Sequence, residues 1–185
     1  MGSVYTSIDE NLQAFIEAQQ MFFVATAPLA ADGHVNLSPK GLESFRILSP
    51  TQVGYVDLVG SGIETVAHLR ENGRITIQFC AYSGAPRIVR LYGRGRAIET
   101  TDAEWREYAE KFPPYASARA VVLVDVERVG DSCGYGVPIY EYVGQRTQLP
   151  AWAASKGAEA TAKYAAEKNR ESIDGLPGLR SASPD

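Results

Sequence analysis

The chain has 185 residues, of which 45% are hydrophobic and 10% aromatic, enough for one folded domain with a buried core. Its formal net charge is −4, and its lysines and arginines are scattered along the sequence. Because nucleic-acid-binding proteins concentrate basic residues on one face, this distribution argues against a nucleic-acid partner.

The sequence also argues against a membrane location and a metal centre. No stretch reaches the ~20 apolar residues that a membrane-spanning helix needs, and no signal peptide is visible, so we expect a cytoplasmic protein without a membrane partner. The two cysteines, Cys80 and Cys133, and the two histidines, His34 and His68, lack the spacing of metal ligands, so we predict no metal site.

The first third of the chain predicts one helix followed by four strands. The helix covers residues 7–20, with Ser7 or Asp9 as its N-cap. The strands are expected at residues 21–29, 34–41, 44–48 and 51–58. The first two strands are joined by an Asp-Gly turn, which predicts a hairpin.

A Gly-Ser-Gly sequence at residues 60–62 joins the fourth strand to a helix predicted over residues 63–72. Glycine lets the backbone approach a ligand closely, and the first turn of a helix offers unpaired N–H groups. The junction therefore suits an anion such as phosphate. The alternative is an ordinary tight connection, capped locally by Ser61 or Thr65.

The rest of the chain predicts four more strands and two helices. The strands are expected at residues 74–82, 86–99, 118–130 and 139–144, and the helices at residues 100–112 and 151–168. In helix 100–112 the spacing places Trp105, Tyr108, Ala109 and Phe112 on one face. In strand 86–99 alternation sends Arg87 and Arg90 to opposite faces, so at most one of them faces a given ligand.

Short links between strands favour an antiparallel barrel over a parallel sheet. Only the strand ending at Leu58 runs directly into a helix, and the dinucleotide motif G-x-G-x-x-G fails because Thr65 occupies its last position. A Rossmann fold is therefore not expected. We predict a mainly β protein, an antiparallel barrel with helices.

Three stretches carry a resemblance to a known family: FFVATAPLAADGHVNLSPKG, GSGIETVAHLRENGRITIQF and PRIVRLYGRGRAI. Over residues 5–179 the chain resembles the pyridoxamine 5′-phosphate oxidase-like family, which has the FMN-binding split-barrel fold, a Greek-key barrel. The resemblance implies a homodimer with FMN at the subunit interface. It assigns residues 1–150 to the barrel domain and residues 151–185 to a C-terminal helix and tail that pack on the barrel or on the partner.

The resemblance also implies where the FMN phosphate binds: on the return strand of the first hairpin and on the loop before helix 63–72. Asp57 would approach the edge of the flavin ring through its backbone. Positive charge would come from Lys40, with Arg87 or Arg90 in support. The remaining expected donors are the side chains of Ser38, Ser61 and Thr65 and the amides of Gly62 and Ile63.

The chain departs from the family pattern at the start of this helix. Members that oxidise B6 vitamers carry an Arg-Lys pair where this chain has Glu64 and Thr65. The histidine and arginine residues that bind the substrate phosphate in those enzymes are also missing. We therefore do not expect pyridoxamine phosphate oxidation.

The resemblance implies an FMN-dependent oxidoreductase that acts on a small molecule with a reduced electron donor, the flavin carrying the redox chemistry. No residue is predicted to be catalytic, because no acid–base pair is visible in the sequence. Three alternatives stay open: an F420-dependent reductase on the same fold, a non-catalytic flavin- or haem-binding protein, and a binding module without a cofactor. The acidic composition argues against an F420-dependent reductase, and the scarcity of histidine argues against a haem-binding protein. Glu64 supports a binding module without a cofactor.

Overall fold

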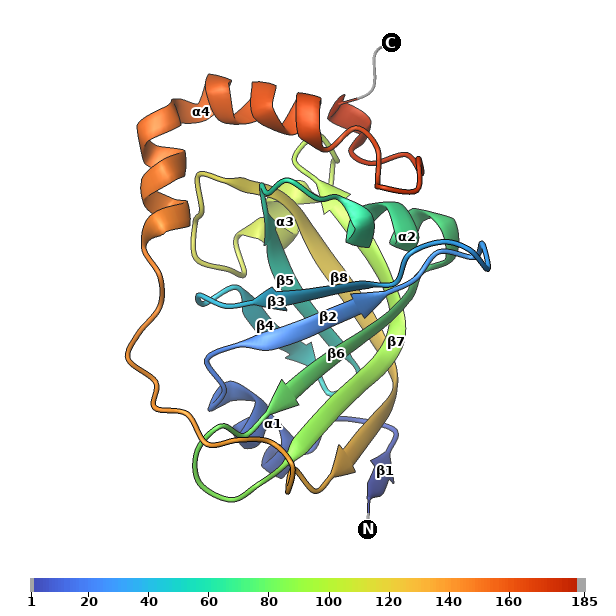
Figure 1. The fold of residues 1–185 in the computed structure, drawn as a ribbon, viewed down its shortest axis with the longest axis vertical. Helices are drawn as coiled ribbons and strands as arrows, with labels where there is room; N and C mark the ends of the chain where they lie inside the picture. The colour runs from blue at the N-terminus through green and yellow to red at the C-terminus, as the bar shows by residue number, and fades with distance from the viewer. Residues whose placement is uncertain (1, 183–185) are drawn as a thin grey trace.

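The computed structural model describes residues 2–182. Residue 1 of the predicted segment 1–150 and residues 183–185 of the predicted segment 151–185 lie outside the described residues. Helices interrupt runs of consecutive strands along the chain (Figure 1). Their bounds are β1 (Ser3–Tyr5), α1 (Glu10–Glu17), β2 (Phe22–Thr26), β3 (Asn36–Lys40), β4 (Phe45–Ser49), β5 (Gln52–Leu58), α2 (Glu64–Asn72), β6 (Arg74–Cys80), β7 (Ile88–Glu99), α3 (Trp105–Ala109), β8 (Ala118–Ser132), α4 (Gln148–Lys168) and the 3₁₀ helix η1 (Arg180–Ala182).

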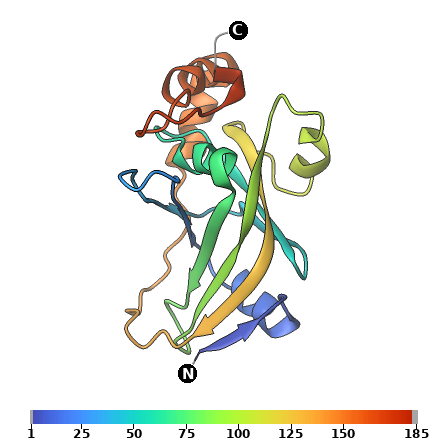
Figure 2. The same ribbon diagram turned by 90° about the vertical axis from the view of Figure 1, so that its right-hand side faces the viewer.

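The strands form one antiparallel sheet in the order β3-β2-β6-β7-β8-β5-β4, and β1 adds a further pairing to β8. Figure 2 shows that β6, β7 and β8 curve strongly along the length of the molecule. Strand β5 pairs with β8 rather than with β6, its successor in the chain, which is a Greek-key crossover. Among the described residues no pairing joins β3 to β4, so the barrel is open between these two edges. The predicted antiparallel barrel is confirmed.

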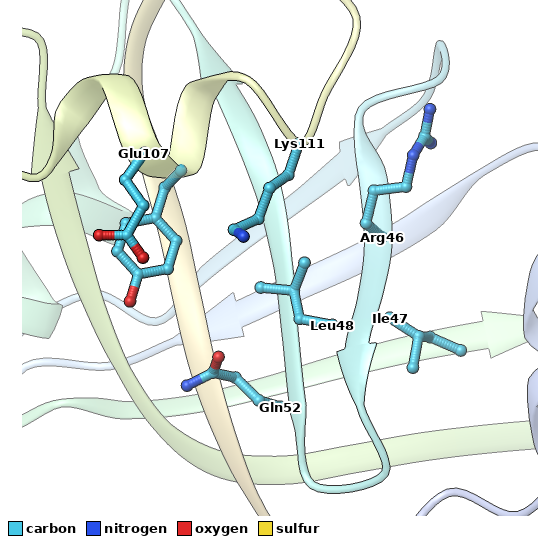
Figure 3. A pocket seen from close by; sticks show the side chains of 7 residues that line it. Arg46, Ile47, Leu48, Gln52, Glu107 and Lys111 are labelled. Carbon is cyan, nitrogen blue, oxygen red and sulfur yellow. The ribbon is translucent and has the colours of Figure 1, made fainter.

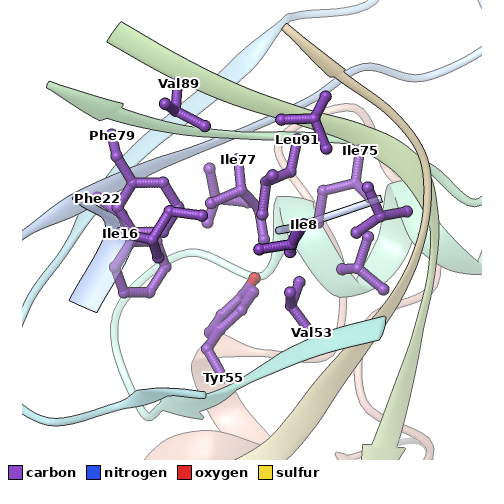
Figure 4. Packing of buried hydrophobic residues seen from close by; sticks show 14 of the residues in the cluster. Ile8, Ile16, Phe22, Val53, Tyr55, Ile75, Ile77, Phe79, Val89 and Leu91 are labelled. Carbon is purple, nitrogen blue, oxygen red and sulfur yellow. The ribbon is translucent and has the colours of Figure 1, made fainter. Parts of the chain in front are cut away.

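The interior of the barrel is filled by the inward-facing residues of its strands (Figure 4). Phe22, Tyr55 and Phe79 are almost completely buried there, and their rings pack with centroids 5.5–5.7 Å apart. Helix α1 closes one end with Leu12 and Ile16, each 1% exposed. This apolar core fixes which face of each strand points inward, and with it the placement of the polar residues described below.

Two further helices cover other surfaces of the sheet. Helix α2 lies at the end of the barrel opposite α1 and ends at Gly73, whose φ of 70° places it in the left-handed C-cap conformation. Helix α3 is shorter than the predicted 100–112. Trp105, Tyr108 and Phe112 nevertheless pack on one cluster at the outer face of β5 and β8, as their spacing indicated.

The structure corrects two expectations about strands. Residues 139–144, predicted as a strand, belong to a segment from 133 to 147 without helix or strand, where Ile139 is 81% and Val143 95% exposed. An alternating apolar pattern forms a strand only beside a free sheet edge, and this segment pairs with none of the described strands. Strand β1 was missed because three residues are too few for a recognisable pattern.

The C-terminal segment packs against the α2 end of the barrel in the same chain. Helix α4 bends at Gly157, where φ is 76°, and its second half lies across the top of the molecule in Figure 1. Ala165 and the tail residue Leu179 share an apolar cluster with Val59 and Ile63, on either side of the Gly-Ser-Gly loop. No helix in the described part of the chain is both long and apolar enough to cross a membrane.

The β-bulge between β7 and β8 generates a stability prediction. The register shifts between Tyr92 and Gly93, and a Cβ at Gly93 would overlap the backbone carbonyl of Asp125. We expect Gly93→Ala to lower the free energy of unfolding by at least about 2 kcal/mol, because backbone cannot move aside as a flexible side chain can. The control Gly136→Ala, whose Cβ would have no neighbour within 4 Å, should change it by less than about 0.5 kcal/mol. Equal urea unfolding midpoints for the two variants would contradict this.

Candidate functional site

Polar side chains gather at the opening of the barrel, where the edge strand β3 faces the end of β5 and the start of α2. Along β3, Leu37 and Pro39 point outward and are exposed, while Asn36, Ser38 and Lys40 point inward and are partly buried. Strand alternation explains this row of three polar side chains on one face. Inward-pointing polar residues also discourage an edge strand from pairing with another chain.

A buried ion cluster links the two sides of the opening. Asp57, at the end of β5, is fully buried. Lys40 Nζ lies 2.7 Å from its Oδ1, and Arg119 Nε lies 2.7 Å from its Oδ2. Burial alone would raise the pKa of Asp57, but Arg119 and Lys40 outweigh this and lower it to about 2. The carboxylate is therefore ionised, and the Lys40–Asp57–Arg119 triad carries a net positive charge.

A second β-bulge directs Arg119 into this cluster. Asp57 pairs with Ala120 while the next residue, Leu58, pairs with Ala118, so Arg119 is the extra residue of β8. A bulge re-aims the side chain of its extra residue, and here the guanidinium also donates from Nη1 to the carbonyl of Gly62 at 2.8 Å. Sequence reasoning missed Arg119. The available signal was a single charged residue within the otherwise apolar run of residues 118–124.

A network of neutral hydrogen bonds joins β3 and β2 to α2. Asn36 Nδ2 donates to Thr65 Oγ1 at 3.0 Å and to Thr26 Oγ1 at 3.1 Å, and Ser38 Oγ donates to Asn36 Oδ1 at 3.0 Å. His68 Nδ1 lies 3.0 Å from Thr26 Oγ1, and burial lowers the pKa of His68, which keeps it neutral. The predicted donors Ser38 and Thr65 therefore lie together in the opening and already have protein partners.

The Gly-Ser-Gly loop is held by its carbonyl groups. Asn169 of the C-terminal tail donates to the Gly60 carbonyl at 2.8 Å, and Arg119 binds the Gly62 carbonyl. In a trans peptide the carbonyl and the following N–H point in opposite directions, so the amides of Ser61 and Ile63 face away from these two donors. None of the described residues accepts a hydrogen bond from the amides of residues 60–66.

This stretch of free amides includes the start of α2, whose N-cap Ile63 makes no side-chain hydrogen bond. The N-terminus of a helix carries partial positive charge, so the loop can accept an anion. The Ser61 side chain is exposed, whereas the Ile63 side chain is 1% exposed and belongs to an apolar cluster. Ile63 can therefore contact a ligand only through its backbone.

Glu64 brings a negative charge to the same loop. A Cβ at Gly62 would overlap Glu64 Oε2, so the carboxylate folds back over the loop. Its other oxygen, Oε1, accepts a hydrogen bond from the backbone N–H of Ile173 in the tail at 3.3 Å. The negative charge of Glu64 therefore lies beside the free amides of the loop.

The hydroxyl of Tyr55 is a buried donor without a partner among the described residues. Tyr55 is 0% exposed, and Lys40 Nζ lies 5.8 Å from the centre of its ring. Burial and the nearby charge of Asp57 raise the pKa of Tyr55 well above its ordinary value of 10.0, so the hydroxyl keeps its proton. An unpaired buried hydroxyl is uncommon, and it offers a hydrogen bond at this end of the barrel interior.

Arg87 and Arg90 lie away from the loop. Arg87 donates to Asp131 over 2.7 Å and 3.1 Å, and Arg90 donates to Ser132 Oγ over 3.2 Å. Both contacts lie where β7 begins and β8 ends, whereas the loop adjoins Ala118 at the beginning of β8. Within one chain the arginine that lies beside Lys40 and the loop is therefore Arg119, whereas Arg87 and Arg90 lie away from them.

Two surface hollows lie outside the opening. One, of about 410 Å³, lies between β4 and α3 (Figure 3) and is lined by Arg46, Ile47, Leu48, Gln52, Glu107, Tyr108 and Lys111. The other, of about 420 Å³, lies on the outer face of β2, β6 and β7, where Arg74, Tyr92 and Arg94 line it. Neither is lined by a predicted site residue. Within residues 2–182 no group of three or more His, Cys, Asp or Glu could hold a metal ion.

The triad generates a pH prediction. The pKa of Asp57 in the folded protein, about 2, lies below its ordinary 3.8, so its stabilisation is complete above about pH 5 and is lost as the pH falls toward 2. Between pH 5 and pH 2 we expect the free energy of unfolding of the wild type to fall by about 2 kcal/mol more than that of Asp57→Asn. Urea unfolding followed by fluorescence at a series of pH values measures the difference. Parallel curves for the two proteins would contradict it.

Comparison with known proteins agrees with this architecture. The sequence profile described as "Pyridoxamine 5'-phosphate oxidase" matches residues 8–133, more than half of the chain. The chain is 41% identical over 202 residues to the pyridoxamine 5′-phosphate oxidase family protein ustO of Aspergillus flavus, and the match covers 100% of this chain and 81% of that protein.

Solved structures show the same fold. HupZ of Group A Streptococcus superposes with a TM-score of 0.51 at 25% identity, over 66% of this chain and 91% of HupZ. A candidate pyridoxamine 5′-phosphate oxidase from Lactobacillus delbrueckii gives a TM-score of 0.52 at 18% identity, over 68% of this chain and 94% of that protein. The barrel is thus the split barrel of these proteins, and the chain belongs to the pyridoxamine 5′-phosphate oxidase family.

Proposed function

We propose that this protein binds FMN at the opening between β3 and β5 and acts as a flavin-dependent oxidoreductase on a small molecule. The observation that carries the proposal is the juxtaposition of the net positive Lys40–Asp57–Arg119 triad with the loop whose amides at residues 60–66 have no acceptor among residues 2–182. Fixed positive charge and convergent N–H groups are the two features that bind a phosphate group.

The donors of the opening fit the phosphate end of FMN. Arg119 is 7% exposed, but Lys40 keeps 20% of its side chain exposed, so the lysine is the accessible cation. The exposed Ser61 hydroxyl and the unpaired Tyr55 hydroxyl add neutral donors. Glu64 is the one group of the loop that opposes an anion.

Family membership supports redox chemistry, while the helix start argues against the family's eponymous reaction. Glu64 and Thr65 stand where a pair of cations is expected in a B6 oxidase, and Thr65 is bonded to Asn36. A bound flavin would supply hydride or electron transfer. The residues of this chain would hold its phosphate, orient its ring and exclude water. Asp57, the carboxylate of the triad, is fixed in ion pairs and cannot act as a base.

Absorbance of the purified protein, alone and after addition of FMN, tests the proposal. An oxidised-flavin spectrum supports it, whereas a Soret band indicates haem and a colourless protein that ignores FMN indicates a binding module. Reduction of the bound flavin by NADPH, NADH or reduced F420 then identifies the electron donor.

The role of Lys40 generates a binding prediction. We expect Lys40→Met to weaken FMN binding at least about tenfold, because it removes a charge-assisted contact to phosphate. Binding of riboflavin, which lacks the phosphate, should stay within about twofold. Quenching of flavin fluorescence measures both affinities, and Lys163→Met, on the exposed face of α4, is the matched control. Unchanged FMN affinity in Lys40→Met would remove this residue from the site.

We further propose that the protein is a homodimer. The outer face of the sheet exposes large apolar side chains, with Val35 at 74%, Leu37 at 64% and Tyr92 at 37% exposure. The segment 133–147 exposes a second set, Tyr135, Ile139, Tyr140, Tyr142 and Val143. Exposed apolar surface of this extent supports an association in which a partner covers it.

The dimer proposal predicts that a charge on the outer face of β3 separates the subunits. We expect the wild type to sediment as a dimer and Leu37→Glu as a monomer, because a buried unpaired carboxylate is costly. The control Leu29→Glu changes a leucine of similar exposure, 63%, in the β2–β3 connection and should remain dimeric. A monomeric wild type, or a dimeric Leu37→Glu, would contradict the proposed interface.

A further inference from the structure

We propose that Glu64 is an internal competitor for the ligand's phosphate and thereby sets the specificity of the site, weakening its preference for phosphorylated over unphosphorylated flavin. The inference rests on the proposed flavin binding at the opening of the barrel.

The Glu64 carboxylate lies over the loop that precedes α2. Glu64 is the first residue of α2, and its Oε2 occupies the space that a Cβ at residue 62 would fill. It therefore lies over the loop at the positive end of the helix, where a negative charge is favoured. An incoming phosphate is attracted to the same place for the same reason.

The C-terminal tail holds the Glu64 carboxylate in this position. Glu64 Oε1 accepts the N–H of Ile173, and this part of the tail is itself fixed to the β2–β3 connection. Asp174 Oδ2 accepts the N–H of His34 at 2.8 Å, and its Oδ1 lies 2.6 Å from His34 Nδ1. A phosphate that binds at the loop must therefore displace a carboxylate that the tail holds in place.

Glu64 offsets the charge of the triad. Lys40, Asp57 and Arg119 together have a single net positive charge, and Glu64 brings one negative charge. A phosphate monoester carries about −1.5 to −2 charges at pH 7, and the charges of these four groups sum to zero. Riboflavin carries no phosphate charge, so its affinity does not depend on the balance of these charges.

The unpaired Tyr55 hydroxyl is independent support for a ligand at this corner. The hydroxyl is completely buried and lies near Asp57 and Thr65, and no described residue accepts a hydrogen bond from it. A ligand that reaches this corner could supply the missing acceptor.

Flavin titrations of Glu64→Gln test the inference. Glutamine keeps the size of the side chain and removes its charge. We expect FMN to bind about tenfold more tightly than to the wild type, while riboflavin affinity stays within about twofold. The control Glu10→Gln removes an acidic residue from the first turn of α1, at the other end of the barrel, and should change neither affinity.

The affinities for FMN and for riboflavin distinguish failure of this inference from failure of the proposed function. If FMN binds but the ratio of FMN to riboflavin affinity is unchanged or lower in Glu64→Gln, the competitor role is overturned and the proposed function stands. If neither flavin binds to the wild type or to any variant, the proposed function is overturned, and this inference with it.

Discussion

The architecture of the opening depends on one buried carboxylate. Asp57 of β5 binds Arg119 of the neighbouring strand β8 and Lys40 of β3, and the contact with Lys40 joins two strands that no backbone pairing connects. Removing a carboxylate from water costs several kcal/mol unless its oxygens are bonded, and here each oxygen has a cationic partner at 2.7 Å. The ion pairs that bridge the open side of the barrel also leave one net positive charge there.

Most of the fold could be predicted from the sequence because it follows from local patterns. Alternation identified the strands and their inward faces, and helical spacing identified the residues of 100–112 that pack on the sheet. Residues 139–144 show the limit of such patterns. Their alternation is compatible with a strand, but whether a sheet edge is available to pair with it depends on the whole fold.

The site could be predicted only in part, for a related reason. Lys40 and Asp57 were expected near the loop, and the structure brings them into contact. Arg119 was missed because a shift of register at a bulge decides where its side chain points, and no local pattern reveals that shift. Arg87 and Arg90 lie away from the loop within the chain, which alternation could not reveal because it defines the face of a strand but not which end of it adjoins the loop.

The loop itself shows how distant parts of the chain prepare a binding surface. Arg119 holds the Gly62 carbonyl and Asn169 holds the Gly60 carbonyl, so the barrel and the tail each orient one peptide group. Because the following amides then point the other way, donors for an anion are created without any side chain at the loop. Such donors carry no full charge. The electrostatic character of the corner is therefore decided by the few ionised groups around it, which gives Glu64 more influence here than in a site built from paired cations.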